Sequence, residues 1–272
     1  MWKLFKKSLL TPTVTARYPE EIAPIPQTLR GKPVIALEKC NGCGICTNFC
    51  PTGAMKAGTG CLDINIAACV FCGLCQEHCP KGAVTLSTDY ELAARDKEDL
   101  RETYCFADNS TEPDLERSGF ELKNKINKLF GRSLHIRHLD TGSCNGCDWD
   151  MSSLLNPIHD IQRLGIDFVA SPRHADMLFC SGAVTRHLEE AVKRTYAAVA
   201  NPKLVAAVGT CACSGGIYRE GYAVLGGIDK VLPVDVYIPG CPPRPQAMIQ
   251  GIMVALGRLE QKSQRRIITK PM

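Results

Sequence analysis

The sequence of 272 residues lacks any run of about eighteen consecutive apolar residues, so it predicts no transmembrane helix. The N-terminal segment, MWKLFKKSLLTPTV, contains basic residues but no apolar stretch long enough for an export signal. The formal net charge of +4 is small and no nucleic-acid-binding motif is present, so we expect no nucleic-acid partner. A Rossmann fingerprint, a P-loop and a Ser-His-Asp arrangement are also missing, so we expect no catalytic residues on this chain.

Cysteine, in contrast, is abundant, with 16 residues in the chain. Because no export signal is recognised, we expect these cysteines in a reducing compartment, the cytoplasm. Cysteines there are typically metal ligands or redox groups rather than disulfides. The chain length suggests two domains, and a hydrophobic content of 45% is sufficient for a full core.

A duplicated motif contains eight of the cysteines. Residues 40–51 read CNGCGICTNFCP and residues 69–80 read CVFCGLCQEHCP, and both are C-x2-C-x2-C-x3-C-P runs. In such runs three cysteines on a tight loop reach three corners of one [4Fe–4S] cube, and the fourth ligates the other cube. The spacing therefore predicts two clusters, the first held by Cys40, Cys43, Cys46 and Cys79 and the second by Cys69, Cys72, Cys75 and Cys50.

Zinc is the alternative occupant of a site with four thiolates. Zinc sites usually combine two C-x2-C pairs across a longer stretch, so the closely spaced, duplicated runs favour iron–sulfur clusters. Cys61 lies between the two runs and fits neither, and we interpret it as a small buried residue. Cys105 stands alone and receives no assignment.

The duplicated run resembles the two-cluster bacterial ferredoxins, which have an α+β fold, over residues 31–88. The flanking stretches MWKLFKKSLLTPTVTARYPEE and LSTDYELAARDKEDL are similar to the ferredoxin-type subunits of formate hydrogenlyase and of complex I. The resemblance implies a place in a larger membrane-bound assembly. Residues 1–30 are interpreted as a docking segment, because Trp2, Phe5 and Leu9 among lysines would suit either a membrane surface or a partner.

Residues 89–133 are rich in charge and are interpreted as a connector. The stretch DYELAARDKEDLRETY has the composition of a solvated helix. Farther along, FELKNKINKLFGR places apolar residues near helical spacing, which predicts an amphipathic helix; these residues are Phe120, Ile126, Leu129 and Phe130. The connector suits either a mobile tether or a docking segment for a partner subunit.

From residue 134 onward, apolar runs alternate with helical patterns. The helical patterns cover residues 187–201 and 244–262. This alternation predicts a parallel sheet with helices on both faces, a flavodoxin-like α/β domain over residues 134–262, followed by a basic tail over 263–272. The runs suited to buried strands are LHIRHL (134–139), DFVAS (167–171), DMLFCSG (176–182), LVAAVG (204–209) and VDVYIPG (234–240).

Cysteines follow three of these predicted strands. Cys144 and Cys147 form a C-x2-C after the first strand, Cys211 follows LVAAVGT, and Cys241 follows VYIPG. Open α/β sheets build their sites at the carboxyl ends of strands, so these residues predict a third cluster site at one sheet edge. The alternative is a thioredoxin-like redox pair at Cys144 and Cys147, but such a pair would need no further cysteines.

Two more cysteines compete for this site. Cys213 lies two residues after Cys211, and in extended backbone the two side chains would point in opposite directions, so only one should reach a cluster. Cys180 lies inside an apolar strand and is expected in the core.

The second half resembles the small, cluster-bearing subunit shared by complex I and the energy-converting group 4 [NiFe] hydrogenases, through ASPRHADMLFCSGAVTR, GTCACSGGIY and DKVLPVDVYIPGCPPRPQAMIQG. The resemblance implies that a third [4Fe–4S] cluster is held by Cys144, Cys147, Cys211 and Cys241. Complex I-type subunits have their first two ligands adjacent. The C-x2-C followed by Asp148 is instead similar to the arrangement in formate hydrogenlyase and related hydrogenases.

These resemblances imply an electron-transfer subunit of a membrane-bound [NiFe] hydrogenase, with three [4Fe–4S] clusters, at the cytoplasmic face of the membrane. The implied partners are a [NiFe]-hydrogenase-type large subunit that reduces protons to H2, integral membrane ion-pumping subunits, and ferredoxin or formate dehydrogenase as electron donor. The first alternative is a complex I-like or hydrogenase-related subunit that delivers electrons to a quinone or a sulfur compound. The second is a soluble ferredoxin with a structural appendage, which would hold about eight iron atoms instead of about twelve.

Overall fold

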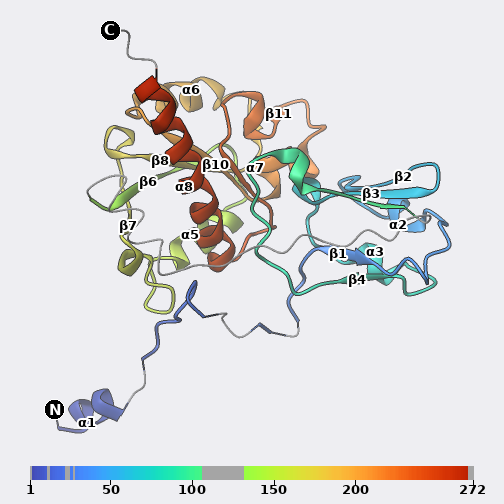
Figure 1. Ribbon diagram of the computed structural model, residues 1–272, viewed down its shortest axis with the longest axis horizontal. Helices are drawn as coiled ribbons and strands as arrows, with labels where there is room; N and C mark the ends of the chain where they lie inside the picture. The colour runs from blue at the N-terminus through green and yellow to red at the C-terminus, as the bar shows by residue number, and fades with distance from the viewer. Residues whose placement is uncertain (1, 11–12, 22–24, 27, 106–131, 269–272) are drawn as a thin grey trace.

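A computed structural model describes residues 2–10, 13–21, 25–26, 28–105 and 132–268, with side chains described up to residue 257. The amphipathic helix predicted at 120–130 and the end of the predicted basic tail lie outside the described residues. The described chain forms a small N-terminal unit with antiparallel strands beside a larger α/β unit (Figure 1). No helix within these ranges is long and apolar enough to cross a bilayer.

The N-terminal unit has two small antiparallel sheets, as the predicted ferredoxin-like fold requires. One sheet pairs β1 with β4, and the other has the order β2-β3-β5. The short helices α2 (Ile45–Asn48) and α3 (Leu74–Glu77) begin after Gly44 and Gly73, both of which have the positive φ that glycine adopts readily. The strands are β1 (Pro33–Ile35), β2 (Met55–Ala57), β3 (Cys61–Asn65), β4 (Val84–Leu86) and β5 (Arg101–Cys105).

The predicted solvated helix over DYELAARDKEDLRETY was wrong. This stretch contains the 3-10 helix η2 (Lys97–Leu100), followed by β5, which pairs with β3. Leu100 is buried, and Tyr104 lies opposite Leu62 in the sheet. Apolar burial and the strand preference of Thr103 and Tyr104 therefore outweigh the local charge pattern.

The larger unit is built on a five-stranded parallel sheet with the order β12-β10-β8-β6-β7. This is the 2-1-3-4-5 order of flavodoxin-like folds, so the predicted fold class is confirmed. Every predicted apolar run contributes a strand to this sheet. The strands are β6 (Leu134–Asp140), β7 (Ile166–Phe168), β8 (Met177–Ser181), β10 (Leu204–Val208) and β12 (Val236–Ile238).

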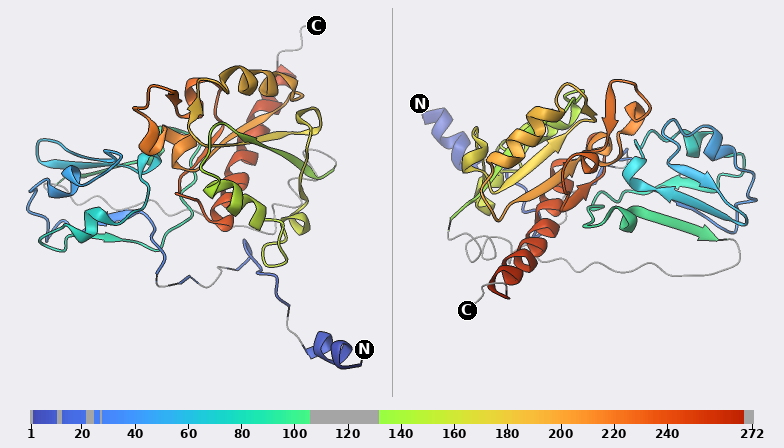
Figure 2. Two further views of the ribbon diagram at one scale, coloured as in Figure 1. Left: turned by 180° about the vertical axis from the view of Figure 1, so that it is seen from behind. Right: turned by 90° about the horizontal axis from the view of Figure 1, so that it is seen from above.

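Helices cover both faces of the parallel sheet (Figure 2). Side chains of α5 (Gly146–Ser153) and α8 (Pro245–Ile268) pack with Phe179 on one face. Val192 of α6 (Glu189–Ala198) and Ala212 of α7 (Thr210–Ser214) pack on the other. The smaller elements are β9 (Val184–Thr185), β11 (Val224–Gly226) and the 3-10 helices η1 (Ile66–Ala68), η3 (Ile161–Leu164), η4 (Pro172–His174), η5 (Gly216–Tyr218) and η6 (Ile228–Lys230).

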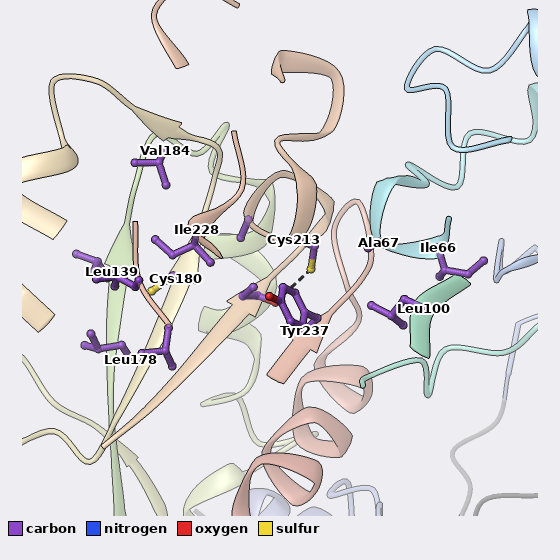
Figure 3. Close-up of a cluster of buried hydrophobic side chains, with 14 of the residues drawn as sticks. Ile66, Ala67, Leu100, Leu139, Leu178, Cys180, Val184, Cys213, Ile228 and Tyr237 are labelled. Carbon is purple, nitrogen blue, oxygen red and sulfur yellow. Dashed lines mark hydrogen bonds between the residues drawn. The ribbon is translucent and has the colours of Figure 1, made fainter. Parts of the chain in front are cut away.

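The two units share one hydrophobic cluster. Ile66 and Leu100 of the N-terminal unit belong to the same buried cluster as Tyr237 and Cys213 of the α/β unit (Figure 3). The backbone of Ala94 also pairs with that of Tyr237, with N···O distances of 3.0 and 2.8 Å. This shared core fixes the cysteine loops of one unit against those of the other.

Candidate iron–sulfur sites

The first predicted set of cysteines surrounds a cavity. Cys40, Cys43, Cys46 and Cys79 all line a cavity of about 280 Å³, together with several glycines. Burial raises the pKa of Cys46, and the neighbouring Cys40, Cys43 and Cys79 raise it further. The structure therefore brings together all four residues that the motif assigns to the first cluster.

The second predicted set is also assembled. Burial raises the pKa of Cys69 to about 12, against a hydrogen bond from the Phe71 amide, and Cys75, Cys50 and Cys72 add to the increase. Burial likewise raises the pKa of Cys75 to about 11, with Cys72 and Cys50 among its neighbours. Cys50 thus lies with the second run, as the exchange of fourth ligands between the two motifs predicts.

The two exchanged cysteines accept equivalent backbone hydrogen bonds. The amide of Ala54 donates to Cys50 Sγ at 3.2 Å, and the amide of Ala83 donates to Cys79 Sγ at 3.2 Å. Burial acts to raise the pKa of both thiols, but the hydrogen bonds that they accept together lower it. The repeated Pro-x-Gly-Ala sequence after each run produces this matching geometry and favours the thiolate, which is the form that binds metal.

The third predicted set converges at the carboxyl edge of the parallel sheet. Cys144 precedes α5, Cys147 lies in α5, Cys211 lies in α7, and Cys241 follows Gly240 after β12. Burial raises the pKa of Cys147, and Cys211, Cys241 and Cys144 raise it further. Burial also raises the pKa of Cys211 to about 11, and the neighbouring Cys241 and Cys144 contribute to this increase.

Glycine backbone approaches two of these thiols closely. A Cβ added to Gly209 would lie 2.5 Å from Cys147 Sγ, and one added to Gly216 would lie 3.0 Å from Cys211 Sγ. Both glycines also have positive φ, at 88° and 54°. A side chain at either position would therefore collide with the thiol of Cys147 or Cys211.

The residues fit iron–sulfur clusters by two observations. Each site offers four thiols, which is the donor set of a [4Fe–4S] cluster. The cavity beside Cys40, at about 280 Å³, is much larger than the roughly 10–15 Å³ that one water molecule needs, so it has room for a group of several atoms.

Cys180 and Cys213 lie away from these sites. Cys180 is fully buried in β8, which confirms the expected core position. Cys213 is also fully buried, and its thiol donates to the Ala207 carbonyl at 3.4 Å. The assumption of extended backbone here was wrong, because α7 is helical. Two residues along a helix correspond to a rotation of about 200°, so Cys211 and Cys213 still point in different directions.

Cys61 and Cys105 form a disulfide, with their Cα atoms 4.1 Å apart. The interpretation of Cys61 as a simple small buried residue was therefore wrong, and Cys105 gains the role that the sequence left open. The antiparallel pairing of β3 with β5 places the two residues directly opposite each other. The expectation that the cysteines are metal ligands or redox groups rather than disulfides was therefore wrong for this pair. No sequence signal indicated the pair, because β5 itself was predicted as helix.

This disulfide is expected to stabilise the N-terminal unit. It spans 44 residues, and a loop of that length corresponds to at most about 4 kcal/mol in the chain-entropy model. We expect the double variant C61S/C105S to lose about 2 kcal/mol of unfolding free energy, because bound clusters would already constrain part of this loop. Anaerobic denaturant titration, with and without a thiol reductant, measures the loss. The reductant should weaken only the unmodified chain; equal sensitivity of both chains would contradict a stabilising disulfide.

A network of polar side chains connects the C-x2-C loop, which carries Cys144 and Cys147, to the parallel sheet. Ser143 Oγ donates to Asp148 Oδ2 at 2.6 Å, and Ser181 Oγ donates to Asp148 Oδ1 at 2.7 Å. His138 Nε2 lies 2.9 Å from Asp148 Oδ1. The sequence singled out Asp148 but not its partners, because His138 and Ser181 come from two different strands, β6 and β8.

The ferredoxin-like unit and the cysteine loops on a flavodoxin-like sheet define an iron–sulfur protein. Two family models match the chain: the 4Fe-4S dicluster domain over residues 32–80, and the NADH ubiquinone oxidoreductase 20 kDa subunit over residues 144–255. The chain belongs to this 20 kDa subunit family, with a dicluster domain preceding it.

Relatives in this family come from hydrogenases and from quinone reductases. "Formate hydrogenlyase subunit 7" of Escherichia coli is 45% identical over 148 residues, covering 54% of this chain and 58% of that protein. "Probable membrane-bound hydrogenase subunit mbhJ" of Pyrococcus furiosus is 43% identical, covering 48% of this chain and 79% of that protein. An NADH-quinone oxidoreductase subunit of Geotalea daltonii is 53% identical, covering 35% of this chain and 55% of that protein.

Proposed function

We propose that this chain is the electron-transfer subunit of a membrane-bound [NiFe] hydrogenase, located peripherally at the cytoplasmic face. It would relay electrons through three [4Fe–4S] clusters, held by the twelve predicted cysteines, to a catalytic large subunit that reduces protons to H2. The donor would be ferredoxin or a formate dehydrogenase, and integral membrane ion-pumping subunits would complete the assembly. The observation that carries this proposal is the convergence of Cys144, Cys147, Cys211 and Cys241 at one sheet edge, beside the dicluster unit.

The order of the sites supports a linear relay. Cys46 of the first site is among the charges that raise the pKa of Cys75 in the second, after burial and nearer cysteines. Cys72 of the second site likewise contributes to the raised pKa of Cys241 in the third site, after burial and Cys144. When bound, each [4Fe–4S] cluster supplies one-electron redox chemistry. The chain's own residues contribute the ligands, the burial and the N–H···S hydrogen bonds that tune each site.

Exposed apolar side chains near the third site support a large-subunit partner there. Trp149 lies two residues after Cys147 and is 78% exposed. Ile217 and Tyr218 follow the Cys211 loop and are also exposed. Exposed aromatic and aliphatic residues beside a redox site are typical of a surface that a partner covers.

The hydrogenase assignment rests on the C-x2-C spacing followed by Asp148 and on the similarity to two hydrogenase subunits. The second candidate is a complex I-like or hydrogenase-related subunit that delivers electrons to a quinone or a sulfur compound. The 53% identity to an NADH-quinone oxidoreductase subunit over 95 residues favours its quinone form.

Nickel separates the two candidates. The tagged chain would be isolated from gently solubilised membranes with its partners, and nickel, iron and hydrogen production would be measured on the same sample. We expect near-stoichiometric nickel together with H2 production from a reduced low-potential donor. Abundant iron and a co-purifying large subunit without nickel would contradict the hydrogenase assignment and favour the second candidate.

A further inference from the structure

The loops of the second and third sites meet at one buried hydroxyl group. Thr210 lies at the first position of α7, directly before Cys211, and its residue is 1% exposed. Its Oγ1 lies 2.6 Å from the carbonyl oxygen of Cys69, which belongs to the other unit. One hydrogen bond therefore connects the residue before a third-site ligand with the backbone of a second-site ligand.

The hydroxyl hydrogen has two candidate acceptors. The Gly240 carbonyl is 3.1 Å from Thr210 Oγ1, but it already accepts the Thr210 amide at 2.8 Å. The contact with the Cys69 carbonyl is shorter, and the Gly240 carbonyl already accepts the Thr210 amide. We therefore assign the hydroxyl hydrogen to the Cys69 carbonyl. Through its amide and its hydroxyl, Thr210 thus joins the loops that carry Cys69, Cys211 and Cys241.

The packing around Thr210 keeps the two loops close. The 3-10 helix η1, which ends just before Cys69, packs on α7. The contacting elements carry small buried residues, Ala67, Ala68 and Ala212, which let their backbones approach.

We propose that the Thr210 hydroxyl is a positioning residue for electron transfer between the second and third sites. It completes a continuous path from Cys69 through its carbonyl and the hydrogen bond to Thr210 and Cys211. With clusters bound, one electron would pass from the second site to the third, with no bond made or broken. This inference rests on the proposed relay and adds where the electron crosses between the two units.

The test measures the rate at which the third cluster is reduced. The isolated assembly, oxidised, would be mixed with a reduced ferredoxin, frozen at millisecond intervals and examined by EPR. An assembly with C147S in the chain supplies the reference spectrum without the third cluster. T210V keeps the size and shape of the side chain but removes the hydroxyl, whereas T210S keeps the hydroxyl.

We expect T210V to retain all three clusters and to reduce the third more slowly than the unmodified chain, because the hydrogen bond to the Cys69 carbonyl is lost. T210S should remain close to the unmodified chain. The matched control is R219Q, which removes another hydrogen bond between the units, from the Arg219 guanidinium to the Thr52 carbonyl. R219Q should leave the rate unchanged.

The inference would be overturned if the third cluster were reduced as fast in T210V as in the unmodified chain. It would also be overturned if R219Q slowed this reduction as much as T210V does, because the effect would then come from general loosening between the units. If T210V loses iron or fails to fold, the reduction rate of the third cluster in T210S is the test. A lower rate in T210S, which retains the hydroxyl, would also overturn the inference. An unmodified assembly without any third-cluster signal would overturn the proposed relay itself, and this outcome is distinct from the results that overturn the role of Thr210.

Discussion

A Cys147→Ser chain is expected to lose about a third of its iron, from about twelve atoms to about eight, and its assembly is expected to stop producing H2. Cys147 is partly buried, and burial raises the pKa of its thiol, with further increases from Cys211, Cys241 and Cys144. Glycine backbone at residue 209 also approaches its sulfur so closely that no larger group fits. Without this ligand the last step to the catalytic subunit would be lost, while the dicluster unit would be unchanged.

Iron analysis, EPR of the reduced chain and the H2 assay measure this effect. The matched control is Cys213→Ala, because Cys213 lies two residues after Cys211 but points into the core. The control should keep its iron and its activity. Full iron content in the Cys147 variant, or loss of the third signal in the Cys213 variant instead, would contradict the ligand assignment.

Cys50→Ala is expected to remove the second cluster, although Cys50 belongs to the first cysteine run. In the structure Cys50 lies with Cys69 and Cys75, and Cys79 lies with Cys46. Loss of the second cluster would separate the first from the third, so electron flow from a protein donor to the large subunit should fall to background.

The comparison variant is Cys46→Ala, which should remove the first cluster and spare the second. EPR distinguishes the two cases. In the Cys50 variant the first and third clusters remain, and both should lose their magnetic coupling to the second cluster between them. In the Cys46 variant the second and third clusters remain and should stay coupled. If both variants lost the same cluster, the two runs would each hold their own cluster without exchange.

The sequence predicted those parts of the molecule in which spacing alone determines geometry. The C-x2-C-x2-C-x3-C-P runs led to two sets of four cysteines that the structure brings together. The five apolar runs became the five strands of the parallel sheet, because strands buried on both faces have a continuous apolar signal. For the third site, the position of the cysteines just after strands predicted that they meet at one sheet edge, because the carboxyl ends of parallel strands share an edge, but the choice of Cys211 over Cys213 came from the family resemblance.

Features that depend on long-range pairing escaped prediction. β5 was interpreted as a solvated helix because its charged residues follow a local helical pattern. The strand that it pairs with, β3, is about forty residues away in the sequence, so its strand conformation depends on tertiary pairing. The Cys61–Cys105 disulfide was missed for the same reason. The contact of Thr210 with the Cys69 carbonyl, which spans 141 residues, depends on how two units pack, and no motif encodes that.

The central claim, three clusters on one chain, is tested most directly by an EPR-monitored redox titration of the full-length chain, with iron and sulfide determined on the same sample. The account predicts about twelve iron and about twelve sulfide per chain, and three unpaired electrons per fully reduced chain, one for each [4Fe–4S] cluster. About eight iron and two unpaired electrons in a chain with intact ferredoxin signals would contradict it. That result would leave Cys144, Cys147, Cys211 and Cys241 without a cluster and the chain without a path to a catalytic partner.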